Sequence, residues 1–102
     1  MGMNHFQINE RSLVLHRAIA ERIRENPILL QTARENLEKW MSEHGRTRYW
    51  AEWQTILNGP LETLLDFLVS PEEKAVWLRQ SSPFCGILTP RERWKIYESC
   101  TA

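Results

Sequence analysis

The chain of 102 residues has the length of one domain, and a protein of this size can bury a single small core. Its 42% hydrophobic and 25% charged residues are typical of a globular protein and exclude a disordered one. The 13 Lys and Arg residues balance 13 Asp and Glu residues, so no overall positive field favours non-specific binding to nucleic acid.

Apolar residues recur at steps of three and four along much of the chain, which predicts amphipathic helices. Residues 1–11 lack a clear period, and we expect them to be extended or frayed. A first helix is predicted from residue 12 to about residue 25. Asn26-Pro27 then ends this helix and starts a second one, which runs to Gly45.

Four shorter helices are predicted after Gly45. An aromatic-rich third helix spans about residues 49–57, and Pro60 opens a fourth helix with a leucine stripe. Residues 70–73 and 89–92 each read as a capping box with proline at the first helical position. They predict the starts of a fifth helix, which buries Val76 or Trp77, and of a sixth helix.

No segment alternates with the period of two that is typical of a strand, and the predicted connections are short. The sequence therefore predicts an all-α fold, a single compact bundle of five to six short helices. The helical domain is expected to span residues 12–98, followed by a tail of residues 99–102.

The segment between the last two helices, residues 81–88, is rich in apolar side chains. It carries Phe84, Ile87 and Leu88, which a solvated linker does not usually need. Either the segment packs on the helical core of its own chain, or it presents Phe84 to another protein together with Arg91, Arg93 and Trp94. The sequence does not decide between these two alternatives.

Few residues form a pattern typical of a metal or catalytic site. His5, His16 and His44 lie far apart at no spacing that zinc ligands use, so we expect no metal. Cys85 has no histidine or carboxylate nearby in sequence to activate it, which favours a small apolar filler over a nucleophile. We therefore expect a protein that is not an enzyme and has no cofactor, unless His16, Cys85 and a carboxylate converge in the fold.

The predicted sixth helix has a local excess of basic residues. Arg91, Arg93 and Lys95 interleave with Trp94, which could contact phosphates and stack on bases. Glutamates on the same helix dilute this charge, and binding to nucleic acid is not the favoured interpretation. A small nucleic-acid-associated regulator remains the alternative function.

The five tryptophans exceed what a core of this size buries completely. Either all of them are core or half-core residues, or some are exposed, as Trp and Arg are in protein interfaces. Exposure is expected at Trp50 and Trp53 and around Phe84 and Trp94. The candidate partner-binding residues are Arg79, Pro83, Phe84, Arg91, Arg93, Trp94, Trp50 and Trp53.

Residues 78–88, Leu-Arg-Gln-Ser-Ser-Pro-Phe-Cys-Gly-Ile-Leu, precede Arg91-Glu92-Arg93-Trp94. This run resembles one found in small helical bacterial proteins that are antitoxin-like partners of a toxin encoded beside them, including toxins of the nucleotidyltransferase type. The matched positions are Arg79, Pro83, Phe84, Gly86, Arg93 and Trp94. The resemblance implies that the protein neutralises a cognate toxin by direct binding.

Two cysteines, Cys85 and Cys100, are too few for a disulfide framework, and no charged-then-apolar leader opens the chain. No apolar run reaches the roughly 18 residues that a membrane span requires. We expect a cytoplasmic protein whose partner is a protein and not a membrane, and we leave homo-oligomerisation open.

Overall fold

The computed structural model describes residues 5–101, and the side chains of residues 8–99. Within this range it contains six α-helices, one 3-10 turn and no strand. These elements are α1 (His5–Glu25), η1 (Pro27–Leu29), α2 (Leu30–His44), α3 (Arg48–Leu57), α4 (Leu61–Leu68), α5 (Glu73–Arg79) and α6 (Pro90–Thr101). The prediction of an all-α bundle of five to six short helices is confirmed.

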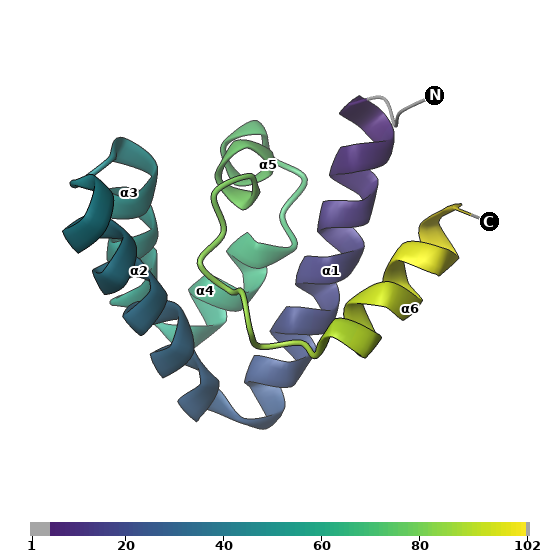
Figure 1. Ribbon diagram of the computed structural model, residues 1–102, viewed down its shortest axis with the longest axis horizontal. Coiled ribbons are helices and arrows are strands. Elements are labelled where there is room, and N and C mark those ends of the chain that lie inside the picture. Colours follow the sequence, from purple (N-terminus) through teal and green to yellow (C-terminus); the bar gives the residue numbers. More distant parts are fainter. Residues whose placement is uncertain (1–4, 102) are drawn as a thin grey trace.

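The helices α1 and α2 form the two arms of a V that is joined at η1 (Figure 1). The helix α6 packs along α1, and α3 packs along α2. The helices α4 and α5 fill the space between the arms, where both contact α1. The segment 80–89, here called the 80–89 loop, runs from α5 down between the arms of the V and then into α6 (Figure 1).

Local sequence signals explain several of the helix boundaries. Gly45 ends α2 with a φ of 84°, which a residue without a Cβ adopts readily, and its N–H donates to the Met41 carbonyl at 2.9 Å. The hydroxyl of Thr47 caps α3 by accepting from the Trp50 N–H at 3.3 Å. At α6, the Thr89 N–H donates to the Glu92 carboxylate at 2.9 Å, and the Glu92 N–H donates to the Thr89 hydroxyl at 3.1 Å. This is the predicted capping box.

Both ends of the predicted helical domain differ from the structure. The helix α1 begins at His5, so residues 5–11 are helical instead of extended, and residues 1–4 lie outside the described residues. The helix α6 continues to Thr101, so most of the predicted tail is also helical. The two ends support each other, because the Arg11 guanidinium lies 4.5 Å from the centre of the Tyr97 ring.

The fifth helix also differs from its prediction. It begins at Glu73, because the Ser70 hydroxyl accepts from the Glu72 N–H at 3.1 Å and this contact holds residues 70–72 in a turn before the helix. Its buried apolar residues are Ala75 and Leu78, whereas Trp77 is 41% exposed. A helix of two turns is too short for periodicity to establish its buried face.

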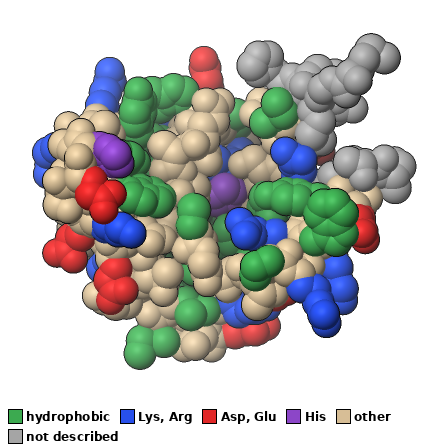
Figure 2. Space-filling view, in the orientation of Figure 1, with side chains coloured by type: hydrophobic (Ala, Val, Ile, Leu, Met, Phe, Trp, Pro, Cys, Tyr) green, Lys and Arg blue, Asp and Glu red, His purple; other side chains and the backbone are tan. Residues whose placement is uncertain are grey.

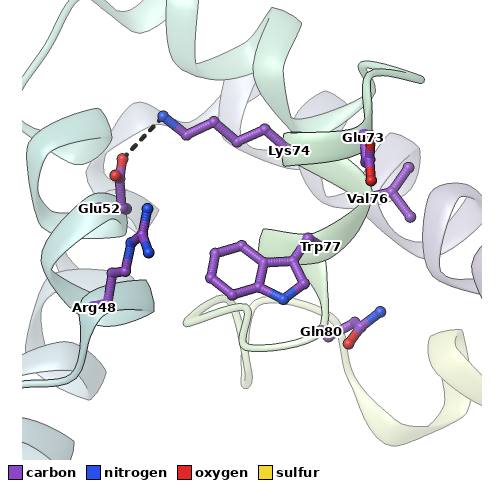
Figure 3. A pocket seen from close by; sticks show the side chains of 7 residues that line it. All are labelled: Arg48, Glu52, Glu73, Lys74, Val76, Trp77 and Gln80. Carbon is purple, nitrogen blue, oxygen red and sulfur yellow. Dashed lines mark ion pairs between the residues drawn. The ribbon is translucent and has the colours of Figure 1, made fainter.

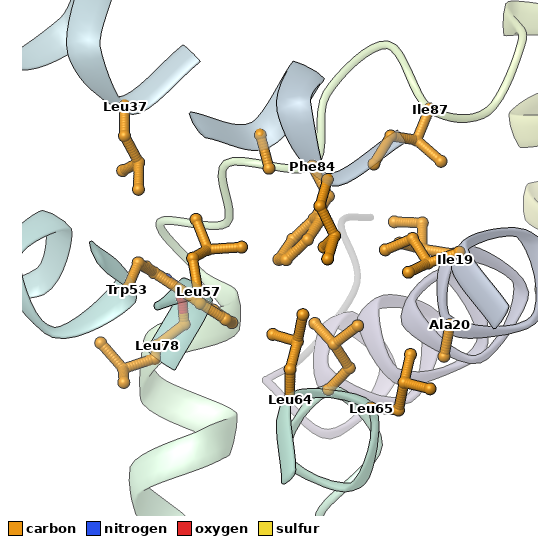
Figure 4. Packing of buried hydrophobic residues seen from close by; sticks show 14 of the residues in the cluster. Ile19, Ala20, Leu37, Trp53, Leu57, Leu64, Leu65, Leu78, Phe84 and Ile87 are labelled. Atoms are coloured by element: carbon orange, nitrogen blue, oxygen red, sulfur yellow. The ribbon is translucent and has the colours of Figure 1, made fainter. Parts of the chain in front are cut away.

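One apolar core lies between the arms of the V. Leucine and isoleucine side chains from α1, α2 and α4 meet Trp53 of α3, which is fully buried and donates its indole N–H to the Leu78 carbonyl at 2.9 Å. Figure 4 shows Phe84 of the 80–89 loop at the centre of this cluster, with Trp53 on one side and Ile19 on the other. Among the described residues, no helix is long and apolar enough to cross a membrane.

Candidate partner-binding surface

The 80–89 loop is tied to both arms of the V by hydrogen bonds. The Ser82 hydroxyl lies 2.8 Å from Nε2 of His16 on α1, and the amide of Asn36 on α2 donates to the carbonyls of Pro83 at 2.8 Å and Cys85 at 3.0 Å. These contacts join residues that are 47 to 66 positions apart. The loop therefore packs on its own chain, the first of the two alternatives that the sequence left open.

Phe84 is the apolar anchor of this loop. Its side chain is only 2% exposed, and its ring makes edge contacts with the rings of Trp53, at 5.4 Å between centres, and of His16, at 6.4 Å. Pro83 beside it is also fully buried. Neither side chain reaches the surface, so partner contacts by Phe84 and Pro83 do not fit this arrangement.

Arg79 has a structural position as well. It is 5% exposed, and its guanidinium donates to the carbonyls of Leu68 at 3.2 Å and Ser70 at 2.7 Å. Leu68 is the last residue of α4 and Ser70 lies two residues beyond it, so the cation of Arg79 lies where the helix dipole favours it. Burial lowers the pKa of Arg79. Arg79 thus joins α5 to the end of α4.

The two tryptophans of α3 face different surroundings. Trp53 is fully buried, which excludes it from the surface that was expected to carry it. Trp50 is half-buried, because its ring packs against Trp40 with 5.7 Å between the ring centres. Of the eight candidate partner-binding residues, Arg91, Arg93 and Trp94 are exposed, and all three lie on α6.

The helix α6 has an inner and an outer face. Ile96 packs against the core, and the Glu92 carboxylate forms an ion pair with Arg22 of α1, so these residues face inward. Arg91, Trp94 and Lys95 share the outer face, because Arg91 lies one turn before the other two at steps of three and four, and Trp94 has 63% of its surface exposed. Figure 2 shows hydrophobic and basic side chains next to one another in the region of α6. We call Arg91, Trp94 and Lys95 the outer face of α6.

A small cavity of about 180 Å³ lies between α1, the 80–89 loop and α6. His16, Ser82, Cys85 and Arg93 line it together with apolar side chains, and no carboxylate is among its described lining residues. His16 and Cys85 therefore share one cavity, but the third group that an activated nucleophile requires is not beside them. Within residues 8–99, no group of three potential metal ligands occurs; the side chains of His5 and Cys100 lie outside the described residues.

His16 is buried, with only 5% of its surface exposed. Its Nδ1 lies 2.7 Å from the Ser12 carbonyl, which assigns the proton to Nδ1 and leaves Nε2 to accept from Ser82. Burial lowers the pKa of His16 from 6.5 to about 4; the charge of Arg79 also lowers it, while the hydrogen bond to Ser12 raises it. A neutral imidazole with both nitrogens occupied acts as a structural link between α1 and the loop.

A second exposed aromatic surface lies at the other end of the molecule, between α3 and α5. Tyr49 and Trp77 are each 41% exposed, and their rings make an edge contact with 5.0 Å between centres. Trp77 borders an open groove of about 800 Å³ that is also lined by Arg48 and Glu73 (Figure 3). The sequence predicted that Val76 or Trp77 would be buried, and no spacing connects Tyr49 to Trp77, so this surface could not be found from the sequence.

Comparisons with protein-family models, curated proteins and solved structures gave no significant match. The functional interpretation therefore depends on the surfaces described above.

Proposed function

We propose that this protein is a non-catalytic binding module, an antitoxin that neutralises a cognate toxin through the outer face of α6. The observation that carries this proposal is the exposure of Trp94 beside basic side chains of the same helix, since a large aromatic ring next to cations is a combination that protein interfaces use. Arg91 and Lys95 flank it, and no ion pair or hydrogen bond joins either to another described residue. Trp and Arg are the residues that most often dominate the free energy of protein–protein binding.

The chemistry of the outer face defines the partner surface. An apolar pocket would receive the Trp94 indole, and carboxylates at its rim would pair with Arg91 and Lys95. The toxin is therefore expected to present an acidic cleft, which the antitoxin covers. The resemblance at residues 78–94 supports a toxin as the partner, while its buried residues Arg79 and Phe84 hold the loop that leads into α6.

The anchoring of α6 favours tight binding. Its first turn is held by the Thr89–Glu92 capping box and by the ion pair from Arg22 to Glu92, and its last turns are held by Arg11 over Tyr97. A helix fixed in this way presents Trp94 without a large loss of conformational entropy on binding.

The test is co-expression with the product of the adjacent gene. Wild-type protein should restore growth of cells that express the toxin and should co-purify with it at 1:1 stoichiometry through a high-salt wash. Trp94→Ala should lose both effects, whereas Trp77→Ala, an equal truncation of an exposed tryptophan away from α6, should retain them. Neutralisation that survives in Trp94→Ala, or no complex with wild type, would reject the proposal.

One observation favours a second candidate, a nucleic-acid-associated regulator. Arg91, Arg93 and Lys95 are all exposed on one helix beside Trp94, the combination that contacts phosphates and stacks on bases. Such binding would weaken steeply as salt rises, because it depends on counterion release. Low-salt titrations with duplex and single-stranded probes distinguish this candidate from salt-resistant binding to a protein.

A further inference from the structure

The groove between α3 and α5 combines apolar and charged side chains in a distinctive order. Arg48 lies on one side of the Trp77 ring and Glu73 on the other (Figure 3). The Trp77 ring, which makes an edge contact with Tyr49, provides the apolar area between them, and Val76 adds to it beside Glu73. Across the groove, Lys74 pairs with Glu52 at 3.1 Å, so these two charges are already compensated.

The charges of Arg48 and Glu73 are not compensated in this way. Both side chains are exposed, and no ion pair or hydrogen bond joins either of them to another described residue. The groove thus offers one available cation and one available anion, with an aromatic surface between them. An acidic partner would meet Glu73 and a basic partner would meet Arg48, so a partner of a single charge is repelled at one end.

We propose that this groove is a self-association surface, and that its occupant is the same groove of a second copy of this chain. A two-fold axis that passes near Trp77 brings Arg48 of each copy opposite Glu73 of the other and places the two Trp77 side chains together. Both charge pairs then form at once. The formal net charge of zero adds no long-range repulsion between copies.

This dimer leaves the proposed toxin-binding surface free. Its contacts come from α3 and α5, while Trp94 lies on α6, which packs chiefly on α1. The dimer would therefore present two outer faces of α6, one on each copy.

Sedimentation velocity of the full-length chain from about 1 μM to about 1 mM tests the proposal, since a small surface of this kind associates weakly. Wild-type protein should shift from monomer to dimer across this range. Arg48→Glu and Glu73→Arg should each weaken self-association by about tenfold or more, because each places like charges opposite one another twice. An equimolar mixture of the two variants should form a heterodimer of wild-type affinity, since both pairs are then opposite in sign again.

Arg17→Glu and Glu35→Arg provide controls that change the net charge equally at exposed positions outside the groove. Neither control should alter self-association, and their mixture should behave as wild type does. Trp77→Ala should be monomeric while its far-UV circular dichroism spectrum remains that of the folded helical protein. The proposal would be overturned if the wild-type protein stays monomeric at 1 mM. It would also be overturned if the groove variants self-associate as strongly as the control variants, or if the mixture does not restore wild-type association.

Discussion

Acidification below pH 6.5 is expected to destabilise this protein through one side chain, His16. The imidazole is 5% exposed, and burial holds its pKa at about 4, whereas an unfolded chain gives it the ordinary value of 6.5. Because the folded state binds the proton more weakly than the unfolded state, His16 lowers the free energy of unfolding only below pH 6.5. This loss grows as the pH falls toward 4.

The magnitude follows from the difference between the two pKa values. Each pKa unit corresponds to about 1.4 kcal/mol, so the full effect is about 3 kcal/mol, of which about 2 kcal/mol is lost between pH 8 and pH 5. The charge of Arg79 on α5 acts in the same direction as burial and also lowers the pKa of His16. Protonation also reverses the contact with Ser82, because Nε2 then donates to the hydroxyl instead of accepting from it.

Urea unfolding followed by far-UV circular dichroism, at half-unit steps from pH 8 to pH 4.5, measures this loss. His16→Gln is the control, because it has no group that titrates in this range, and its free energy of unfolding should change little with pH. The pKa of Glu92 is lowered to about 2, chiefly by the hydrogen bond from the Thr89 N–H, so its contribution is lost only below pH 4.5. If the free energy of unfolding falls equally with pH in wild type and in His16→Gln, the role given to His16 is refuted.

Two further substitutions test the buried positions of the 80–89 loop and α5. Phe84→Ala should cost about 3–5 kcal/mol in the free energy of unfolding, because it leaves a cavity between Trp53 and His16. The equivalent truncation Trp94→Ala should cost less than about 0.5 kcal/mol, and a cost below about 1 kcal/mol for Phe84→Ala would show that the loop is not docked. Arg79→Met should lower the free energy of unfolding by about 1–3 kcal/mol, because two carbonyls at the end of α4 lose their donor. Thermal unfolding checks this loss, and an unchanged melting temperature would contradict the structural role of Arg79.

Much of the fold could be predicted from local signals. Apolar spacing located the helices, and Gly45 and the Thr89–Glu92 box marked boundaries that the structure confirms. The ends of the domain were not predictable, since α1 and α6 extend through contacts such as Arg11 with Tyr97, which join residues far apart in sequence. Tertiary packing overrides weak local periodicity at such ends.

The candidate site was predictable only in part. Arg91, Arg93 and Trp94 are exposed, as a binding surface requires, but the direction of the 80–89 loop depends on His16 and Asn36, which no spacing connects to it. Two tryptophans three residues apart shared the same sequence signal, yet only Trp53 of the two is fully buried, while Trp50 packs against the edge of the core. The composition of a segment shows that apolar side chains need burial; it does not show whether the chain itself or a partner buries them.

The affinity of Trp94→Ala for the toxin tests the central claim most directly. Isothermal titration of the purified toxin with wild type, Trp94→Ala and Trp77→Ala, with the melting temperature of each, separates binding from folding. We expect Trp94→Ala to lose about 2 kcal/mol, or about 30-fold in Kd, with an unchanged melting temperature, while Trp77→Ala binds as wild type does. Wild-type affinity in Trp94→Ala would show that the outer face of α6 is not the surface that binds the toxin.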